Sequence, residues 1–154
     1  MATVRASAEG MVAAPPGAVY GYLADMTEHH PRFLPPAFSG FSVESGGVGA
    51  GTTVRFTVSA GGRSRAYHMV VAEPEPGRVL TETDTSSSLV TTFTVTPKDG
   101  ASMVEIVTTW KGAKGVGGFF ERTFAPRVMR KIYLDELQRL DTYARARGTT
   151  SDSS

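Results

Sequence analysis

The feature that most constrains this chain is a late change in its hydrophobic period. From Phe38 to Trp110, short runs of β-branched and aromatic residues alternate with clusters of Gly, Pro, Asp and Ser. Such runs, separated by turn-forming residues, are typical of consecutive antiparallel strands. Beyond a glycine-rich stretch, apolar residues recur at helical spacing as far as Ala146. A row of strands followed by one long helix predicts an α+β domain with a single core.

The strand-rich segment divides into six predicted strands, and Thr3–Val12 adds a seventh at the N-terminus. Alternation assigns the faces of these strands, because successive side chains of a strand point to opposite sides. Val54, Phe56 and Val58 share one face, which we expect to be buried. The six strands are expected at residues 39–44, 53–59, 64–73, 79–83, 89–96 and 102–111.

Two short helices are predicted between the first and second strands. Pro16 presets the backbone for a helix start, and Val19, Leu23 and Met26 then form one apolar stripe. This stripe predicts a helix over Pro16–Met26 that leaves Tyr20 outside the buried face. The following connector contains three prolines, so it can form at most a short helix around residues 28–34.

The last and longest element is predicted to be a helix over Gly118–Ala146, with Gly148 as its C-terminal stop. Pro126 lacks the N–H of a helical hydrogen bond, so we expect a kink there. The domain is expected to span residues 1–148, and residues 149–154 to form a disordered polar tail. The apolar arc of this helix contains Met129, Ile132, Tyr133, Leu137, Leu140 and Ala144.

Composition excludes several classes of partner. The chain has 16 Lys+Arg and 15 Asp+Glu, so it lacks the broad positive field that favours nucleic acid. No stretch approaches the roughly 20 apolar residues of a membrane span, so stable membrane insertion is not expected. Cysteine is absent, which excludes disulfides and thiolate metal sites. We expect a cytoplasmic protein.

The order of these elements resembles the helix-grip fold of the START-like (SRPBCC) superfamily, which includes polyketide cyclase/dehydrase-like proteins and lipid-transport domains. The resemblance implies a seven-stranded curved antiparallel sheet wrapped around the long kinked C-terminal helix, with a cavity between them. It also implies a cavity mouth formed here by Gly46–Gly51 and Gly115–Phe124. Four passages carry it, namely Ala14–Asp25, Gly46–Thr52, Val71–Leu80 and Phe124–Leu140.

The function that follows is binding of a hydrophobic or amphipathic small molecule, such as a lipid, a polyketide or an aromatic compound. One alternative is an aromatase/cyclase- or dehydratase-type enzyme that modifies polyketides. Another is a protein-interaction module with a closed core. No cofactor is expected. The predicted ligand-binding residues are Phe33, Phe56, Val58, Tyr67, Met69, Phe93, Trp110, Phe120, Phe124 and Glu136.

Three side chains are candidates for catalysis. Tyr67 shares the inward face of its strand with Met69 and could polarise a ligand carbonyl, while a histidine facing the cavity, such as His30, could be a general base. Arg122 is the third candidate. Both Arg122 and Glu136 fall near the centre of the apolar arc, where an unpaired charge is costly. Each either reaches into a hydrated cavity and contacts a polar group of the ligand or faces solvent, which for Arg122 would follow from rotation at the kink.

Two further motifs are set aside. Asp25, His29 and His30 are close in sequence, but adjacent histidines diverge and no further ligand follows, so no metal site is predicted. The glycine run at Gly46–Gly51 is followed by a strand and lacks the Lys-Ser/Thr of a phosphate loop. We interpret it as a turn between strands.

Overall fold

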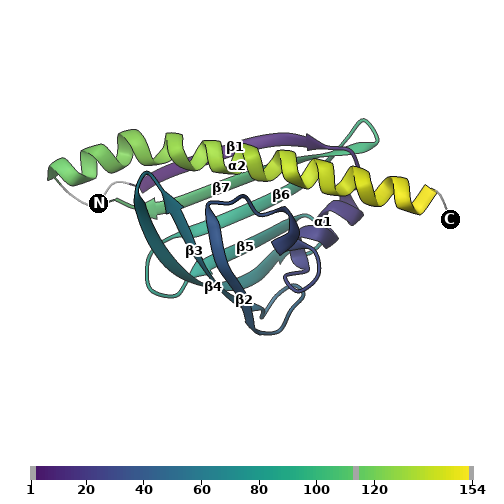
Figure 1. Cartoon of the computed structure of the whole chain (residues 1–154), viewed down its shortest axis with the longest axis horizontal. Coiled ribbons are helices and arrows are strands. Elements are labelled where there is room, and N and C mark those ends of the chain that lie inside the picture. Colours follow the sequence, from purple (N-terminus) through teal and green to yellow (C-terminus); the bar gives the residue numbers. More distant parts are fainter. Residues whose placement is uncertain (1–2, 113–114, 153–154) are drawn as a thin grey trace.

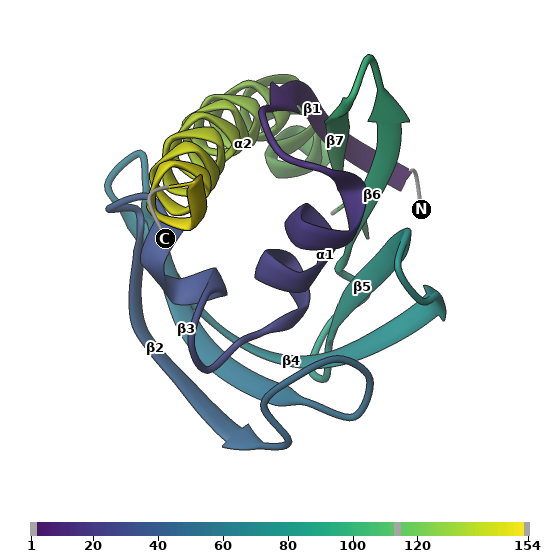
Figure 2. The same cartoon turned by 90° about the vertical axis from the view of Figure 1, so that its right-hand side faces the viewer.

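The seven predicted strands form one antiparallel sheet in the order β1-β7-β6-β5-β4-β3-β2. The computed structural model describes residues 3–112 and 115–152, and in this range the side chains of residues 115–124 and 149–152 are not described. Strands that follow one another from β2 to β7 pair as hairpins, and β1 pairs with β7. The sheet therefore curls around the long helix α2 (Figures 1 and 2).

All seven strands are confirmed, with ends that differ from the predicted ones by one or two residues. Each hairpin turn falls at a predicted cluster of turn residues, such as Gly61 and Gly62, which both have positive φ. The strands are β1 (Thr3–Val12), β2 (Phe38–Ser45), β3 (Thr53–Ala60), β4 (Arg63–Glu75), β5 (Val79–Asp84), β6 (Val90–Lys98) and β7 (Ala101–Lys111).

The three helical elements are also confirmed, with different ends. Helix α1 spans Pro16–Ala24, and the connector forms a single 3-10 turn, η1, at His30–Phe33. Helix α2 spans Gly115–Asp152 and passes through Pro126 without a break. The kink expected at that proline stays a prediction. Over the described residues, no helix is both long and apolar enough to cross a membrane.

The predicted helix stop at Gly148 is wrong. Gly148 lies inside α2 and does not have the positive φ of a C-terminal cap. The region predicted as a polar tail therefore overlaps this helix as far as Asp152. Ser153 and Ser154 lie outside the described residues, and the tail as a whole remains a prediction.

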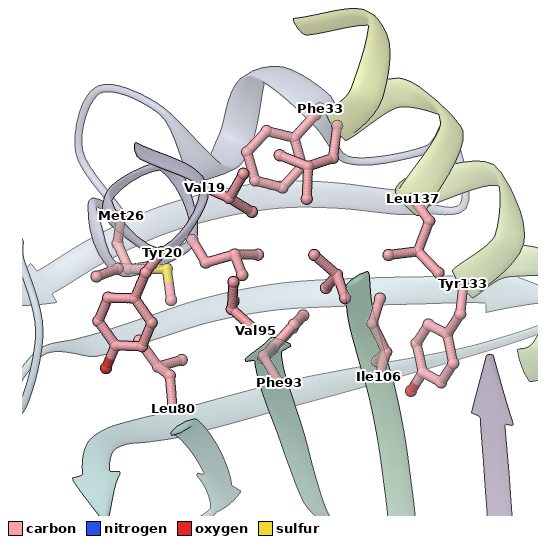
Figure 3. Close-up of a cluster of buried hydrophobic side chains, with 14 of the residues drawn as sticks. Val19, Tyr20, Met26, Phe33, Leu80, Phe93, Val95, Ile106, Tyr133 and Leu137 are labelled. Atoms are coloured by element: carbon pink, nitrogen blue, oxygen red, sulfur yellow. The ribbon is translucent and has the colours of Figure 1, made fainter. Parts of the chain in front are cut away.

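The core lies on the concave face of the sheet, between the strands and the helices (Figure 3). Val19, Leu23 and Met26 of the predicted α1 stripe are all at most 1% exposed. Tyr20, predicted to lie outside the stripe, is buried as well, because α1 sits within the curl of the sheet (Figure 2). Its hydroxyl donates to Glu73 at 2.7 Å.

The glycine loop at Gly46–Gly51, which the resemblance implied as part of a cavity mouth, contributes no residue to the lining of the interior cavity described below. It is attached to the end of α1, since the Met26 N–H donates to the Gly47 carbonyl and the Gly49 N–H donates to the Ala24 carbonyl. The Ala50 N–H donates to Glu73 at 2.7 Å. These bonds hold the loop against the end of α1. The other predicted part of the mouth, Gly115–Phe124, has undescribed side chains.

Candidate functional site

An interior cavity lies between the concave face of the sheet, η1 and α2. Its volume is about 40 Å³. Its walls are mostly apolar and include aromatic rings from β2, β3, β4 and β6. The lining residues are His30, Leu34, Phe38, Phe41, Phe56, Val58, Tyr67, Met69, Glu82, Leu89, Thr91, Phe93, Met129, Tyr133 and Glu136.

The structure brings many of the predicted site residues together around this cavity. They are Phe56, Val58, Tyr67, Met69, Phe93, Glu136 and the candidate base His30. Phe33 is buried but does not line the cavity, and its ring centroid is 4.9 Å from that of His30. Trp110 lies elsewhere, on a separate hollow nearer the surface. The side chains of Phe120, Phe124 and Arg122 are not described.

The polar end of the cavity is built around His30, which is 2% exposed. Its Nδ1 lies 2.7 Å from the carbonyl oxygen of Leu23. A carbonyl can only accept, so Nδ1 carries a proton, and Nε2 is the nitrogen that points to Glu136, with Oε2 at 3.7 Å. Burial lowers the pKa of His30, but Glu136 and Glu82 outweigh this effect and the pKa is raised.

Two carboxyl groups face this histidine from different elements. Glu136 comes from α2, is 2% exposed, and its Oε2 has no hydrogen-bond partner among the described residues. Glu82 comes from β5 and is 6% exposed. Burial raises the pKa of Glu82 to about 7; His30 opposes this shift and the negative charge of Glu136 adds to it. Near neutral pH, the cluster therefore contains an exchangeable proton.

A chain of hydroxyl groups continues from the same wall. Thr91 and Thr108 are cross-strand neighbours on β6 and β7, and their hydroxyls are 2.8 Å apart. Thr108 also forms a hydrogen bond with Tyr133 of α2. Burial raises the pKa of Tyr133, so its phenol stays protonated. These hydroxyls satisfy one another and fix α2 on the sheet.

A second and more open hollow, of about 440 Å³, lies next to the cavity. Tyr67, Leu89 and Met129 line both spaces, so these three side chains separate them. The hollow carries two cationic residues, Arg65 and Lys111. Arg65 lies over the ring of Tyr67, 5.1 Å from its centroid, and 3.8 Å from the buried Asp84.

The adjacent histidines diverge, as the sequence predicted. His30 points inward, whereas His29 lies with its Nδ1 2.6 Å from the hydroxyl of Tyr143. The Asp25 carboxylate accepts from the backbone N–H groups of Thr27 and Glu28. Among the described residues, no group of three or more His, Asp or Glu is placed to bind a metal ion.

Sequence reasoning missed Glu82, and strand alternation could have found it. Leu80, Glu82 and Asp84 have the same parity along β5, and all three are buried. An apolar residue at the first position indicates the inward face, so acidic residues at the next two inward positions were a visible anomaly. Thr91 has the same parity as Phe93 and Val95 along β6, so alternation also places it on the inward face.

Comparison with known proteins supports this description. The sequence matches the family of polyketide cyclase/dehydrase and lipid transport proteins over residues 1–145. The solution structure of KanY protein is 36% identical, with a TM-score of 0.84, and the match covers 94% of this chain and 99% of that one. A comparison with curated proteins found no match.

More distant solved structures share the fold. The Zhui aromatase/cyclase from Streptomyces sp. R1128 is 16% identical, with a TM-score of 0.73 and coverage of 95% and 96%. The di-domain aromatase/cyclase StfQ is 15% identical, with a TM-score of 0.72, and the match covers 96% of this chain and 52% of that one. The chain belongs to the polyketide cyclase/dehydrase and lipid transport family, within the START-like superfamily that its sequence resembles.

Proposed function

We propose that the chain binds a hydrophobic or amphipathic small molecule of polyketide-like or aromatic character in the interior cavity. One observation carries the proposal: an apolar, aromatic-walled space ends in three convergent polar side chains, His30, Glu82 and Glu136. Mostly apolar walls with a few placed polar groups are the usual composition of small-molecule sites. A core evolved for stability alone has no use for two buried carboxyl groups, since their burial is costly.

Binding requires the cavity to open. A volume of about 40 Å³ holds roughly one to three water molecules, whereas ligand pockets usually measure about 300–1,000 Å³. Movement of Tyr67, Leu89 and Met129 would join the cavity to the adjacent hollow. Met129 is unbranched and flexible, which suits a side chain that must move aside.

The test is a fluorescence titration with N-phenyl-1-naphthylamine, a neutral apolar probe. In Val58→Trp the indole ring takes the place of the smaller valine side chain and fills the cavity, so we expect the affinity for the probe to fall about tenfold or more. Val70→Trp is the matched control, because Val70 is 38% exposed and lies on the opposite face of β4. Equal probe binding by both variants would place the ligand elsewhere.

An enzyme is the second candidate, and the joint presence of His30 and Tyr67 on one cavity favours it. A base and a phenol that line one cavity could move a proton and polarise a carbonyl while the aromatic walls hold a reactive chain folded. Cyclisation of a poly-β-ketone substrate should then fall in both His30→Gln and Tyr67→Phe. Turnover that survives both replacements and Arg122→Gln would exclude this version of the enzyme.

The third candidate, a protein-interaction module, is favoured by the small cavity volume, because such a module needs no interior space. It predicts that N-phenyl-1-naphthylamine does not bind the unaltered protein at all. The titration above therefore separates this candidate from the first two.

A further inference from the structure

The unmatched oxygen of Glu136 restricts what kind of polar group the cavity can accept. Oε2 of Glu136 is buried and accepts no hydrogen bond from the described residues. The His30 Nε2 at 3.7 Å is within ion-pair range but beyond hydrogen-bond range. A buried carboxylate oxygen without a donor is costly, so a ligand group that donates to this oxygen avoids the free-energy penalty of leaving it unpaired.

The charges around this oxygen exclude an anion. The ionisable groups lining the cavity are His30 from η1, Tyr67 from β4, Glu82 from β5, and Tyr133 and Glu136 from α2. Among the side chains that the structure describes, the lining contains no Lys or Arg, and the single cationic group there, His30, already faces Glu136. Among the described residues, a ligand carboxylate at this end would meet two carboxyl groups, Glu82 and Glu136, and no uncommitted cation. Arg65 and Lys111 line the second, more open hollow next to the cavity, called the outer hollow below.

An apolar group is also a poor fit at this end. It would leave Oε2 of Glu136 buried and unpaired, which removes the gain that a donor provides. A hydroxyl meets both requirements, because it donates a hydrogen bond to Oε2 of Glu136 and carries no negative charge. Phenols and enols also bring the flat apolar body that the walls of Phe56, Phe93 and Tyr67 would contact.

We infer that the inner end of the cavity recognises a neutral hydroxyl of the ligand, phenolic or enolic, which donates a hydrogen bond to Oε2 of Glu136. This inference rests on the proposed function, since it assigns a chemical class to the ligand of the same cavity. Glu136 is then the specificity-determining residue. Carboxylates are rejected at this end, and any anionic group of the ligand extends to the outer hollow.

Three probes of similar size separate the possibilities: 2-naphthol donates, 2-methoxynaphthalene only accepts, and 2-naphthoate is an anion. Their affinities are measured by displacement of N-phenyl-1-naphthylamine and by calorimetry, at a pH where the naphthol is neutral. A hydrogen bond to a charged group predicts that 2-naphthol binds about tenfold or more tightly than its methyl ether. We expect 2-naphthoate to bind most weakly.

The variant Glu136→Gln replaces an acceptor oxygen with an amide that can donate. Because the amide keeps one acceptor oxygen but no charge, this variant should show a much smaller preference for 2-naphthol over 2-methoxynaphthalene, while Glu136→Asp, which keeps the carboxylate, should retain more of it. Glu75→Gln is the matched control, because Glu75 is an exposed carboxylate at the end of β4, and it should leave the preference unchanged. Circular dichroism checks that each variant is folded. The comparison of 2-naphthol with 2-methoxynaphthalene in the unaltered protein tests the inference without any variant.

The outcomes distinguish the inference from the proposed function. Equal affinities for 2-naphthol and 2-methoxynaphthalene in the unaltered protein overturn the inference while leaving a ligand-binding cavity in place. A preference for 2-naphthol that persists undiminished in Glu136→Gln overturns the role of Glu136. Failure of all three probes and of N-phenyl-1-naphthylamine to bind overturns the proposed function and the inference with it.

Discussion

Replacing Glu82 by glutamine should change how the stability of the protein depends on pH. The pKa of this buried carboxyl rises from its ordinary 4.5 to about 7 on folding. A group with a raised folded-state pKa binds its proton more tightly in the folded protein. Its stabilising contribution is therefore present at low pH and is lost as the pH rises through about 7. Glutamine, which resembles the protonated acid and does not titrate, removes this dependence.

The magnitude follows from the size of the shift. One pKa unit corresponds to about 1.36 kcal/mol, so the full difference between protonated and ionised Glu82 is roughly 3 kcal/mol. Between pH 5 and pH 8, the linkage relation gives a loss of about 2–3 kcal/mol for the unaltered protein relative to Glu82→Gln. The two proteins should be similar in stability near pH 5, and the variant should be more stable at pH 8.

Urea unfolding at pH 5, 6, 7 and 8 measures this difference, with Glu75→Gln as the control for removing one exposed carboxylate. Glu82 is also among the groups that raise the pKa of His30, so replacing Glu82 changes the titration of both residues. A carbon-13 titration of the Glu82 carboxyl in the unaltered protein therefore gives an independent midpoint for Glu82 itself, expected near 7. Parallel stability curves, within about 0.5 kcal/mol, together with a midpoint near the ordinary 4.5, would refute the reasoning.

Two further predictions concern stability. Phe33 is 1% exposed and packs against His30, so Phe33→Ala should lower the free energy of unfolding by about 3–5 kcal/mol in urea, and a loss under 1 kcal/mol would contradict its place in the core. At Gly49, φ is +71° and an added Cβ would lie 2.3 Å from the Glu73 carboxylate, so Gly49→Ala should cost about 2 kcal/mol or more. Gly61→Ala is its control, because φ there is +61° but nothing lies within 4 Å, and it should cost only about 1 kcal/mol. Equal losses at the two glycines would show that contact with Glu73 does not matter.

The aromatic and apolar walls of the cavity were largely predictable from sequence. Phe56, Val58, Tyr67 and Met69 alternate along two paired strands, and alternation depends only on the chemistry of near neighbours. The register places Phe56 opposite Tyr67, with ring centroids 5.7 Å apart. Glu136 falls within the apolar arc of its helix, so the sequence offered its burial as one of two alternatives, and the structure shows it to be 2% exposed.

Other features needed the tertiary structure. Tyr20 is buried although it lies outside the stripe of α1, because this helix is enclosed on more than one side (Figure 2). The glycine loop is bonded to α1 and Glu73, contacts that join segments far apart in the chain. Gly148 continues the helix, because its backbone stays in the right-handed region.

The sequence by itself determined the elements and their buried faces, because hydrophobic period and turn residues act over a few neighbouring positions. Only the tertiary structure decided that His30, Glu82 and Glu136 meet at one end of a cavity. Their meeting depends on the register of β5 in the sheet and on where α2 lies across it, and neither is encoded in local spacing. Local chemistry fixes which way a side chain points, whereas long-range packing fixes what it meets.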